Sequence, residues 1–120
     1  MLKRRKGFGT YKQEVASKFG NKPTTIKWKG KDCSFQSQKE AHRAWELQAL
    51  EKAGEITELE RQVTFRLDVN GVHVCKYIAD FTYTDKRGNQ HIEDTKGAWT
   101  AVFTMKKRLM KALGHEIEIL

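Results

Sequence analysis

The spacing of apolar residues predicts two helices in this chain. Ser37 and Glu40 form an S-x-x-E capping box that opens the first helix, and Gly54 is suited to end it, so we expect this helix from residue 38 to about residue 53. Thr100 is suited to cap the second helix, which we expect to end at Gly114. The apolar face of the second helix is predicted to carry Val102, Met105, Leu109 and Leu113.

Between the two helices, β-branched and aromatic residues predict three antiparallel strands at about residues 60–69, 72–84 and 89–95. Asn70-Gly71 is a strong signal for the first hairpin turn, and Asp85-Lys86-Arg87-Gly88 supplies the second. A short hairpin is expected around Gly30, and a last strand within residues 115–120. The predicted fold is α/β, a mixed β-sheet flanked by helices in the order helix, three antiparallel strands, helix, strand.

The length of the chain, 120 residues, fits one domain that buries a core without disulfides, so Cys33 and Cys75 are expected to be reduced thiols. No apolar run is long enough to span a membrane, and the basic start does not lead into an apolar signal core. We therefore expect a cytoplasmic protein that does not bind membranes.

The net charge of +8 is concentrated at the start of the chain. The first 31 residues hold ten Lys and Arg and one acid, a balance of +9, whereas the remainder holds thirteen Lys and Arg and fourteen acids, a balance of −1. Residues 1–16 are therefore expected to form a basic arm, which is either a flexible solubilising segment or a segment that tracks nucleic-acid phosphates. Residues 17–120 are expected to form the single folded domain.

The second predicted hairpin brings two carboxylates together. If its strands pair around a turn centred on Arg87, residues whose numbers sum to 174 lie opposite each other, and Asp80 faces Asp94. Two carboxylates whose Cβ atoms are about 5 Å apart are unfavourable unless one takes a proton or a cation lies between them. Mg²⁺ meets this requirement, because it prefers hard oxygen ligands and commonly takes one or two carboxylates.

Two further residues complete a candidate catalytic set. Lys96 lies two positions beyond Asp94 on the same strand face, where it would serve the attacking water and balance charge at a phosphate. Glu40 is expected to point inward at the start of the first helix. The set of Glu40, Asp80, Asp94 and Lys96 suits metal-assisted phosphodiester hydrolysis.

Each member of this set also has a purely structural explanation. Glu40 is fully accounted for as half of the capping box. The two aspartates would equally form ordinary strand-end ion pairs with Lys96 or Arg87, and a bulge of one residue would place them on opposite faces of the sheet. The four His residues show no metal-ligand spacing with the two Cys, and no hydrolase, P-loop or Rossmann motif occurs.

Several short motifs resemble a known family in the order in which they occur. Glu40, Asp80 and Asp94-x-Lys96 resemble the PD-(D/E)XK nuclease superfamily. More closely, about residues 17–120 are similar to a phage and prophage family of small uncharacterised proteins placed in that superfamily. The motifs that carry this likeness are Phe19-Gly20-Asn21-Lys22, Phe35-x-Ser37-x-x-Glu40-Ala41, Leu59-Glu60-x-Gln62, Tyr77-x-Ala79-Asp80-Phe81-x-Tyr83 and Glu93-Asp94-Thr95-Lys96-Gly97.

The resemblance implies a restriction-endonuclease-like core and a role for each site residue. It implies that Asp80 and Asp94 bind Mg²⁺, for which Mn²⁺ substitutes, with help from the main-chain carbonyl of Thr95. It further implies that Lys96 serves the attacking water and that Glu40 completes the site.

The chain departs from the family pattern at two points. Ala79 stands where the Pro that names the first motif would precede Asp80, and Glu93 competes with Asp94 for the role of second acid. Strand alternation places Glu93 on the other face from Lys96, which favours Asp94. Two polar or aromatic residues, Gln62 and Trp99, either contact the site and substrate or have ordinary structural roles.

We therefore expect a Mg²⁺-dependent DNA endonuclease. Resemblance to small resolvases of the superfamily implies that it cuts branched DNA, such as the Holliday junctions of DNA recombination, and two symmetric cuts imply a homodimer. DNA phosphates are expected to be held by Lys3, Arg4, Arg5, Lys6, Lys106, Lys107 and Lys111. The alternatives are a DNA-nicking endonuclease of the same superfamily and a non-catalytic phage nucleic-acid-binding protein. A phage-encoded protein would act in the host cytoplasm.

Overall fold

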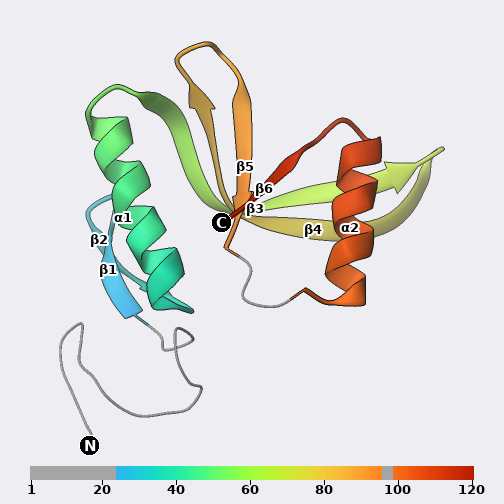
Figure 1. Cartoon of the computed structure of the whole chain (residues 1–120), viewed down its shortest axis with the longest axis horizontal. Coiled ribbons are helices and arrows are strands. Elements are labelled where there is room, and N and C mark those ends of the chain that lie inside the picture. The colour runs from blue at the N-terminus through green and yellow to red at the C-terminus, as the bar shows by residue number, and fades with distance from the viewer. Residues whose placement is uncertain (1–23, 96–98) are drawn as a thin grey trace, which may run out of the picture. The chain divides into compact units, whose positions relative to one another are not determined.

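The computed structural model describes residues 24–95 and 99–120. The basic arm expected at residues 1–16 lies outside the described residues, as does Lys96. The elements follow one another as β1 (Thr24–Trp28), β2 (Lys31–Phe35), α1 (Gln38–Lys52), β3 (Ile56–Val69), β4 (Val72–Asp85), β5 (Gln90–Asp94), α2 (Ala101–Ala112) and β6 (Ile117–Ile119) (Figure 1). The fold is mixed α/β, with two helices, a four-stranded sheet and a separate two-stranded hairpin among the described residues.

The chain divides into two compact units, Met1–Ala49 and Leu50–Leu120. In the first, β1 and β2 form an antiparallel hairpin that turns at Lys29 and Gly30. The Ser37 half of the capping box predicted at the start of α1 is confirmed, since the backbone N–H of Glu40 donates to Ser37 Oγ at 3.1 Å. The predicted length of this helix is also confirmed, because α1 ends at Lys52, two residues before Gly54.

The second unit is built on a sheet in the order β3-β4-β5-β6. The first two pairings are antiparallel and the last is parallel, so the sheet is mixed as expected. The predicted hairpin turn between β3 and β4 is confirmed, because Asn70 and Gly71 have φ angles of 52° and 80°, the left-handed pair that a type I′ turn requires. The strand before it begins at Ile56, earlier than the sequence indicated.

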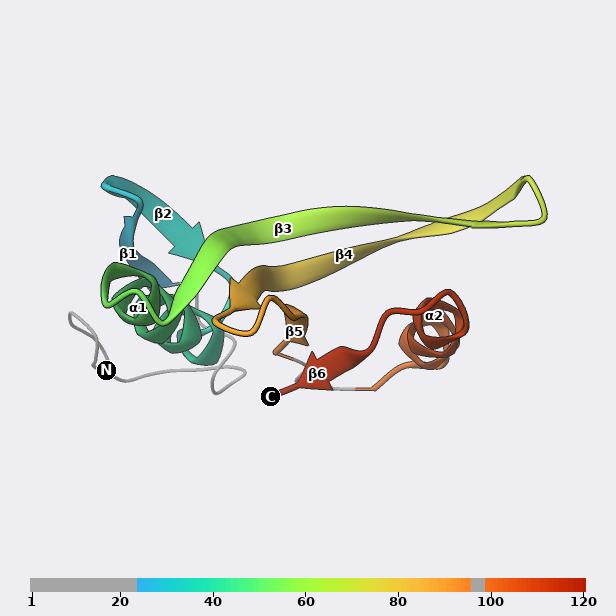
Figure 2. The ribbon, with the colours of Figure 1, turned by 90° about the horizontal axis from the view of Figure 1, so that it is seen from above.

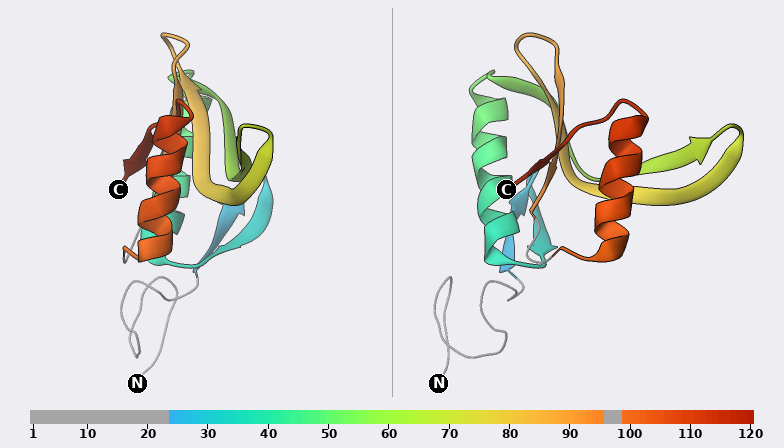
Figure 3. Two further views of the ribbon diagram at one scale, coloured as in Figure 1. Left: turned by 90° about the vertical axis from the view of Figure 1, so that its right-hand side faces the viewer. Right: turned by 45° about the vertical axis from the view of Figure 1, so that its right-hand side comes forward.

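Helix α2 packs against the β3–β4 hairpin and the strands beside it. Figures 2 and 3 show α2 alongside the half of this hairpin that carries the Asn70-Gly71 turn. Its predicted capping residue is confirmed, because Thr100 Oγ1 accepts a hydrogen bond from the N–H of Phe103 at 3.0 Å. The core of this unit consists of Leu67, Tyr77, Ala79, Ile92, Phe103, Met110 and Ile117.

The prediction for the apolar face of α2 holds for Leu109, which packs against the core, and is wrong for the other three residues. The helix buries Phe103 and Met110, whereas Val102 and Met105 are 63% and 68% exposed. Two apolar stripes lie almost side by side on this helix, and periodicity alone does not say which one faces the sheet. The ring of Phe103 decides the outcome, because it lies edge-on to Trp99 at 5.2 Å and beside Tyr77 at 6.4 Å between ring centroids.

Among the described residues, no helix is long and apolar enough to cross a membrane.

Candidate active site

The register of the β4–β5 hairpin agrees with the predicted arithmetic. The four observed pairs run from Thr84 and Gln90 to Phe81 and Glu93, and each pair of numbers sums to 174. One further step in the same register places Asp80 opposite Asp94 at the end of β5. The four observed pairs show no bulge, and both shifts of register lie between β3 and β4.

Asp80 is held by the residue that follows β5. The backbone N–H and the side-chain Oγ1 of Thr95 both donate to Asp80 Oδ2, at 2.8 and 2.7 Å. Two donors on one oxygen fix the orientation of the carboxylate, because rotation would break both bonds. No described residue donates a hydrogen bond to Asp80 Oδ1.

Asp94 is oriented by Tyr77, a residue of the hydrophobic core. It is only 4% exposed, and its Oδ2 accepts a hydrogen bond of 2.6 Å from the hydroxyl of Tyr77. Burial raises the pKa of Tyr77 well above its usual range, and the hydrogen bond to Asp94, the charge of Asp94 and the charge of Asp80 raise it further. The Tyr77 hydroxyl therefore remains a hydrogen-bond donor to Asp94 at physiological pH.

Gln62 stands on the other side of Asp80. The flanking pairs Arg61 with Phe81 and Val63 with Ala79 place Gln62 opposite Asp80 on β3. Its φ angle of 55° lies in the left-handed region, which costs a residue other than glycine about 1–3 kcal/mol. Strained backbone of this kind concentrates at functional sites. The position of Gln62 beside Asp80 therefore favours the alternative in which Gln62 contacts the site or the substrate.

The donor set fits a hard divalent cation. Asp80 and Asp94 offer carboxylate oxygens from neighbouring strands, and Mg²⁺ commonly takes one or two carboxylates and completes its shell with water and phosphate. Among residues 24–95 and 99–120, no group of three or more His, Cys, Asp or Glu side chains could hold a metal ion.

Of the remaining predicted site residues, the structure describes Glu40 and Trp99 but not Lys96. Glu40 is buried in the first turn of α1 and belongs to the other compact unit, so its membership of the site stays a prediction. Lys96, which follows Thr95, lies outside the described residues. Trp99 is more than half exposed, with its ring against that of Phe103.

The basic residues expected to hold DNA phosphates also differ from one another. On α2, Lys106 and Lys107 are half-buried and Lys111 is exposed. The ammonium of Lys107 lies 3.9 Å from the carboxylate of Glu116. The four basic residues at positions 3–6 lie outside the described residues.

Sequence reasoning missed Tyr77 as a site residue. Strand alternation places Tyr77 and Asp80 on opposite faces of β4, so no pattern indicated that the Tyr77 hydroxyl would reach the aspartate end of β5. The side chain of Thr95 was also missed, since only its carbonyl had been assigned a role.

A second polar cluster on β5 was missed although the register rule could have found it. His91 lies opposite Tyr83, and the two rings stack with their centroids 4.9 Å apart. The nitrogens of His91 lie 2.8 Å from Asp85 Oδ2 and 2.6 Å from Glu118 Oε2. These hydrogen bonds, that of Asp85 foremost, raise the pKa of His91 above 6.5. On the same strand the buried carboxylate of Glu93 accepts a hydrogen bond of 2.5 Å from Tyr83.

Comparison with known proteins places the chain in a family. No curated protein and no solved structure matches it. The model of the family DUF1064, described as a protein of unknown function, matches residues 16–119. Because this match covers most of the sequence, the chain belongs to the DUF1064 family.

Proposed function

We propose that this protein is a metal-dependent DNA endonuclease that hydrolyses phosphodiester bonds on a PD-(D/E)XK, restriction-endonuclease-like core. The observation that carries the proposal is the register of the β4–β5 hairpin, whose four pairs end at Phe81 and Glu93 and, continued by one step, set Asp80 opposite Asp94. Two adjacent carboxylates are unfavourable unless one takes a proton or a cation lies between them, and phosphodiester hydrolysis is a reaction that a cation held in this way promotes.

Two residues orient the carboxylates of the proposed site. Thr95 fixes the carboxylate of Asp80 with two hydrogen bonds, and Tyr77 fixes that of Asp94 with one. A bound Mg²⁺ supplies positive charge where the transition state accumulates negative charge and makes water a competent nucleophile at neutral pH. Groups fixed before the substrate arrives need no reorganisation during the reaction, which is how an electrostatic site lowers the barrier.

Two predicted residues complete the proposed site. Lys96, two residues after Asp94, would orient the attacking water and balance charge at the phosphate. Glu40 is the further acid that the motif order assigns to the site. Both roles rest on the motif order Glu40, Asp80, Asp94-x-Lys96 rather than on measured contacts.

The proposed substrate is branched DNA in the cytoplasm, cut by a homodimer. Resolving a four-way junction needs two symmetric cuts, which two copies related by a twofold axis supply. The branch preference follows from the resemblance to small resolvases. A nicking enzyme of the same superfamily would share the residues and differ in its substrate and subunit arrangement.

The direct experiment offers four labelled substrates to the purified protein: a four-way junction, a nicked duplex, a linear duplex and a single strand. Each is incubated with Mg²⁺, with Mn²⁺ and with chelator. We expect cleavage of the junction with either metal and none with chelator. Preference for the nicked duplex would assign the nicking alternative, and tight binding without cleavage of any substrate would assign the non-catalytic one.

The matched controls are Asp80→Ala and an exposed acid away from the site, Asp68→Ala. Asp68 lies near the far tip of the β3–β4 hairpin, where it contacts His73 and Arg66. The proposal predicts that only Asp80→Ala abolishes cleavage. Activity that survives Asp80→Ala would end the assignment, because it would come from another site or from a contaminating nuclease.

A further inference from the structure

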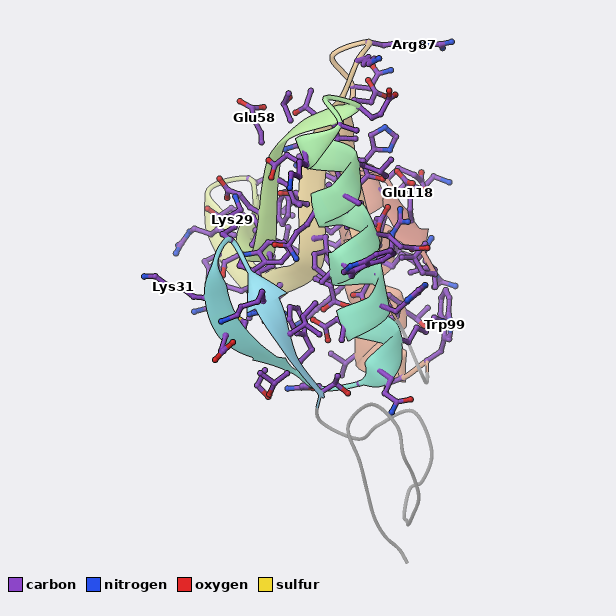
Figure 4. All side chains as sticks on the ribbon, turned by 90° about the vertical axis from the view of Figure 1, so that its left-hand side faces the viewer. Lys29, Lys31, Glu58, Arg87, Trp99 and Glu118 are labelled. Carbon is purple, nitrogen blue, oxygen red and sulfur yellow. The ribbon has the colours of Figure 1, made fainter. Side chains whose placement is uncertain are left out.

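The β1–β2 hairpin, residues Thr24–Phe35, carries three lysines within five positions. Lys27, Lys29 and Lys31 are all exposed, and Figure 4 shows Lys31 extending away from the ribbon. The acid opposite Lys27, Asp32, pairs with it at 2.9 Å, whereas Lys31 has no ion-pair partner among the described residues. We call this hairpin the lysine wing.

The tip of the lysine wing is fixed by one side chain of α1. The amide oxygen of Gln48 accepts a hydrogen bond from the backbone N–H of Lys29 at 2.8 Å. Its amide nitrogen donates to the carbonyl of Lys27 at 2.9 Å. Gln48 thus engages a donor and an acceptor two residues apart, as a neighbouring strand would, and links the turn to α1.

The turn itself positions Lys29. The φ angle of Lys29 is 51°, in the left-handed region, and the clamp by Gln48 acts on this residue. Its ammonium lies 5.9 Å from the centroid of the Trp28 ring, within the range of a cation–π contact. Trp28 in turn lies edge-on to the buried Phe35, with 6.3 Å between centroids. Backbone and side chain of Lys29 are therefore both held before any partner binds.

We propose that the lysine wing binds the phosphate backbone of duplex DNA. A two-stranded ribbon is narrow enough to enter the major groove, and lysines at its tip would meet the phosphates that border it. A wing ordered in advance loses less conformational entropy on binding than a flexible basic segment does. The inference rests on the proposed function for its choice of DNA as partner, and it adds a contact surface outside the carboxylate pair.

The experiment measures the affinity for a labelled linear duplex in chelator, by fluorescence anisotropy over a range of salt concentrations. Each lysine–phosphate contact contributes about 0.9 to the slope of log affinity against log salt. The variant Lys29→Asn, Lys31→Gln removes two charges, and Asn suits the left-handed position. We expect weaker binding to all duplex sequences and a slope smaller in magnitude by about 2.

The matched control also removes two exposed lysines, Lys39 and Lys52 of α1, as Lys39→Gln, Lys52→Gln. Its slope should stay close to that of the wild type. An equal loss of slope in both variants would overturn the proposal, because binding would then follow net charge and not the wing. An unchanged slope after removal of Lys29 and Lys31 would overturn it as well.

Gln48→Ala separates positioning from charge. It leaves every lysine in place but frees the turn, so the affinity should fall at all salt concentrations while the slope stays at the wild-type value. Circular dichroism would verify that the variant remains folded. Unchanged affinity in Gln48→Ala would overturn the claim that Gln48 positions the wing.

The binding and cleavage experiments distinguish failure of this inference from failure of the proposed function. Binding in chelator requires no catalysis. A wild-type protein that binds DNA through Lys29 and Lys31 but never cuts it would therefore refute only the proposed nuclease function. If the wild type cuts DNA and the lysine variant binds DNA as tightly as the wild type, only the proposed role of the lysine wing would be refuted.

Discussion

The repulsion between Asp80 and Asp94 can be measured as a coupling energy. Asp80→Asn and Asp94→Asn each remove one negative charge while retaining the shape and one acceptor oxygen of the side chain. The single changes have mixed effects, since each also weakens hydrogen bonds from Thr95 or Tyr77. Combining them in a double-mutant cycle cancels those separate terms and leaves the interaction between the two charges.

The expected size follows from the register. Directly opposed side chains have Cβ atoms about 4.5–5.5 Å apart, and we take about 5 Å as the separation of the two charges. Coulomb's law then gives a repulsion of about 1 kcal/mol in a water-like dielectric and about 3 kcal/mol at an effective dielectric constant of about 20. Asp94 is buried and Asp80 half-buried, which favours the upper part of that range.

The assay is urea denaturation of the four proteins of the cycle in chelator. We expect a coupling energy of about 1–3 kcal/mol, with the sign of mutual repulsion. Added Mg²⁺ should stabilise the wild type more than any of the three variants, since a ligand that binds the folded state raises its stability. The control cycle combines Asp94→Asn with Asp68→Asn at the distant hairpin tip, and should be additive within about 0.5 kcal/mol.

A coupling energy indistinguishable from that of the control cycle would refute the reasoning. It would mean that the two carboxylates do not approach each other as the register implies. An attractive coupling would refute it equally.

Three further changes test the contacts around the site. Tyr77→Phe removes the donor to buried Asp94 and should lower the free energy of unfolding by about 1–3 kcal/mol in urea denaturation. Thr95→Val removes one of the two donors to Asp80 and should lower it by about 1 kcal/mol, with recovery in Thr95→Ser. His91, whose carboxylate partners raise its pKa above 6.5, should contribute stability that is complete below about pH 6.5 and lost as the pH rises through the folded-state pKa. The free energy of unfolding of the wild type should therefore be lower at about pH 8 than at about pH 6, and His91→Gln should lack this contribution.

Each of these expectations has a clear contrary result. Equal stability of Tyr77→Phe and the wild type would mean that the hydroxyl does not satisfy Asp94. A Thr95→Ser variant as unstable as Thr95→Val would show that the lost methyl group matters and not the hydroxyl. An equal pH dependence in wild type and His91→Gln would assign the titration to another group.

The parts of the fold that follow from local chemistry could be predicted from the sequence. Asn70-Gly71 adopts the left-handed angles that only a few residue types accept readily, so the turn and the hairpin it joins were identifiable. The second turn set the register of β4 and β5, in which the pairing of Asp80 with Asp94 is the next step after the observed pairs. Ser37 and Thr100 marked the helix starts for the same reason, since capping depends on neighbouring residues alone.

The parts that depend on tertiary packing could not be predicted. The face that α2 buries was decided by how Phe103 fits its aromatic neighbours, which no periodicity reveals. The contact of Tyr77 with Asp94 crosses from one face of β4 to the end of β5, against simple alternation. The left-handed angle of Gln62 carries no signal in residue type, because glutamine seldom adopts it.

The central claim is that Asp80 and Asp94 together enable metal-dependent cleavage of DNA. The most direct measurement is the single-turnover rate of cleavage of a labelled four-way junction in Mg²⁺, by wild type and Asp94→Asn purified side by side. The account predicts cleavage by the wild type and a loss of about 100-fold or more in the variant, the scale on which removal of one electrostatic catalytic group acts. Equal rates in the two proteins, or no cleavage by the wild type in either Mg²⁺ or Mn²⁺, would contradict it.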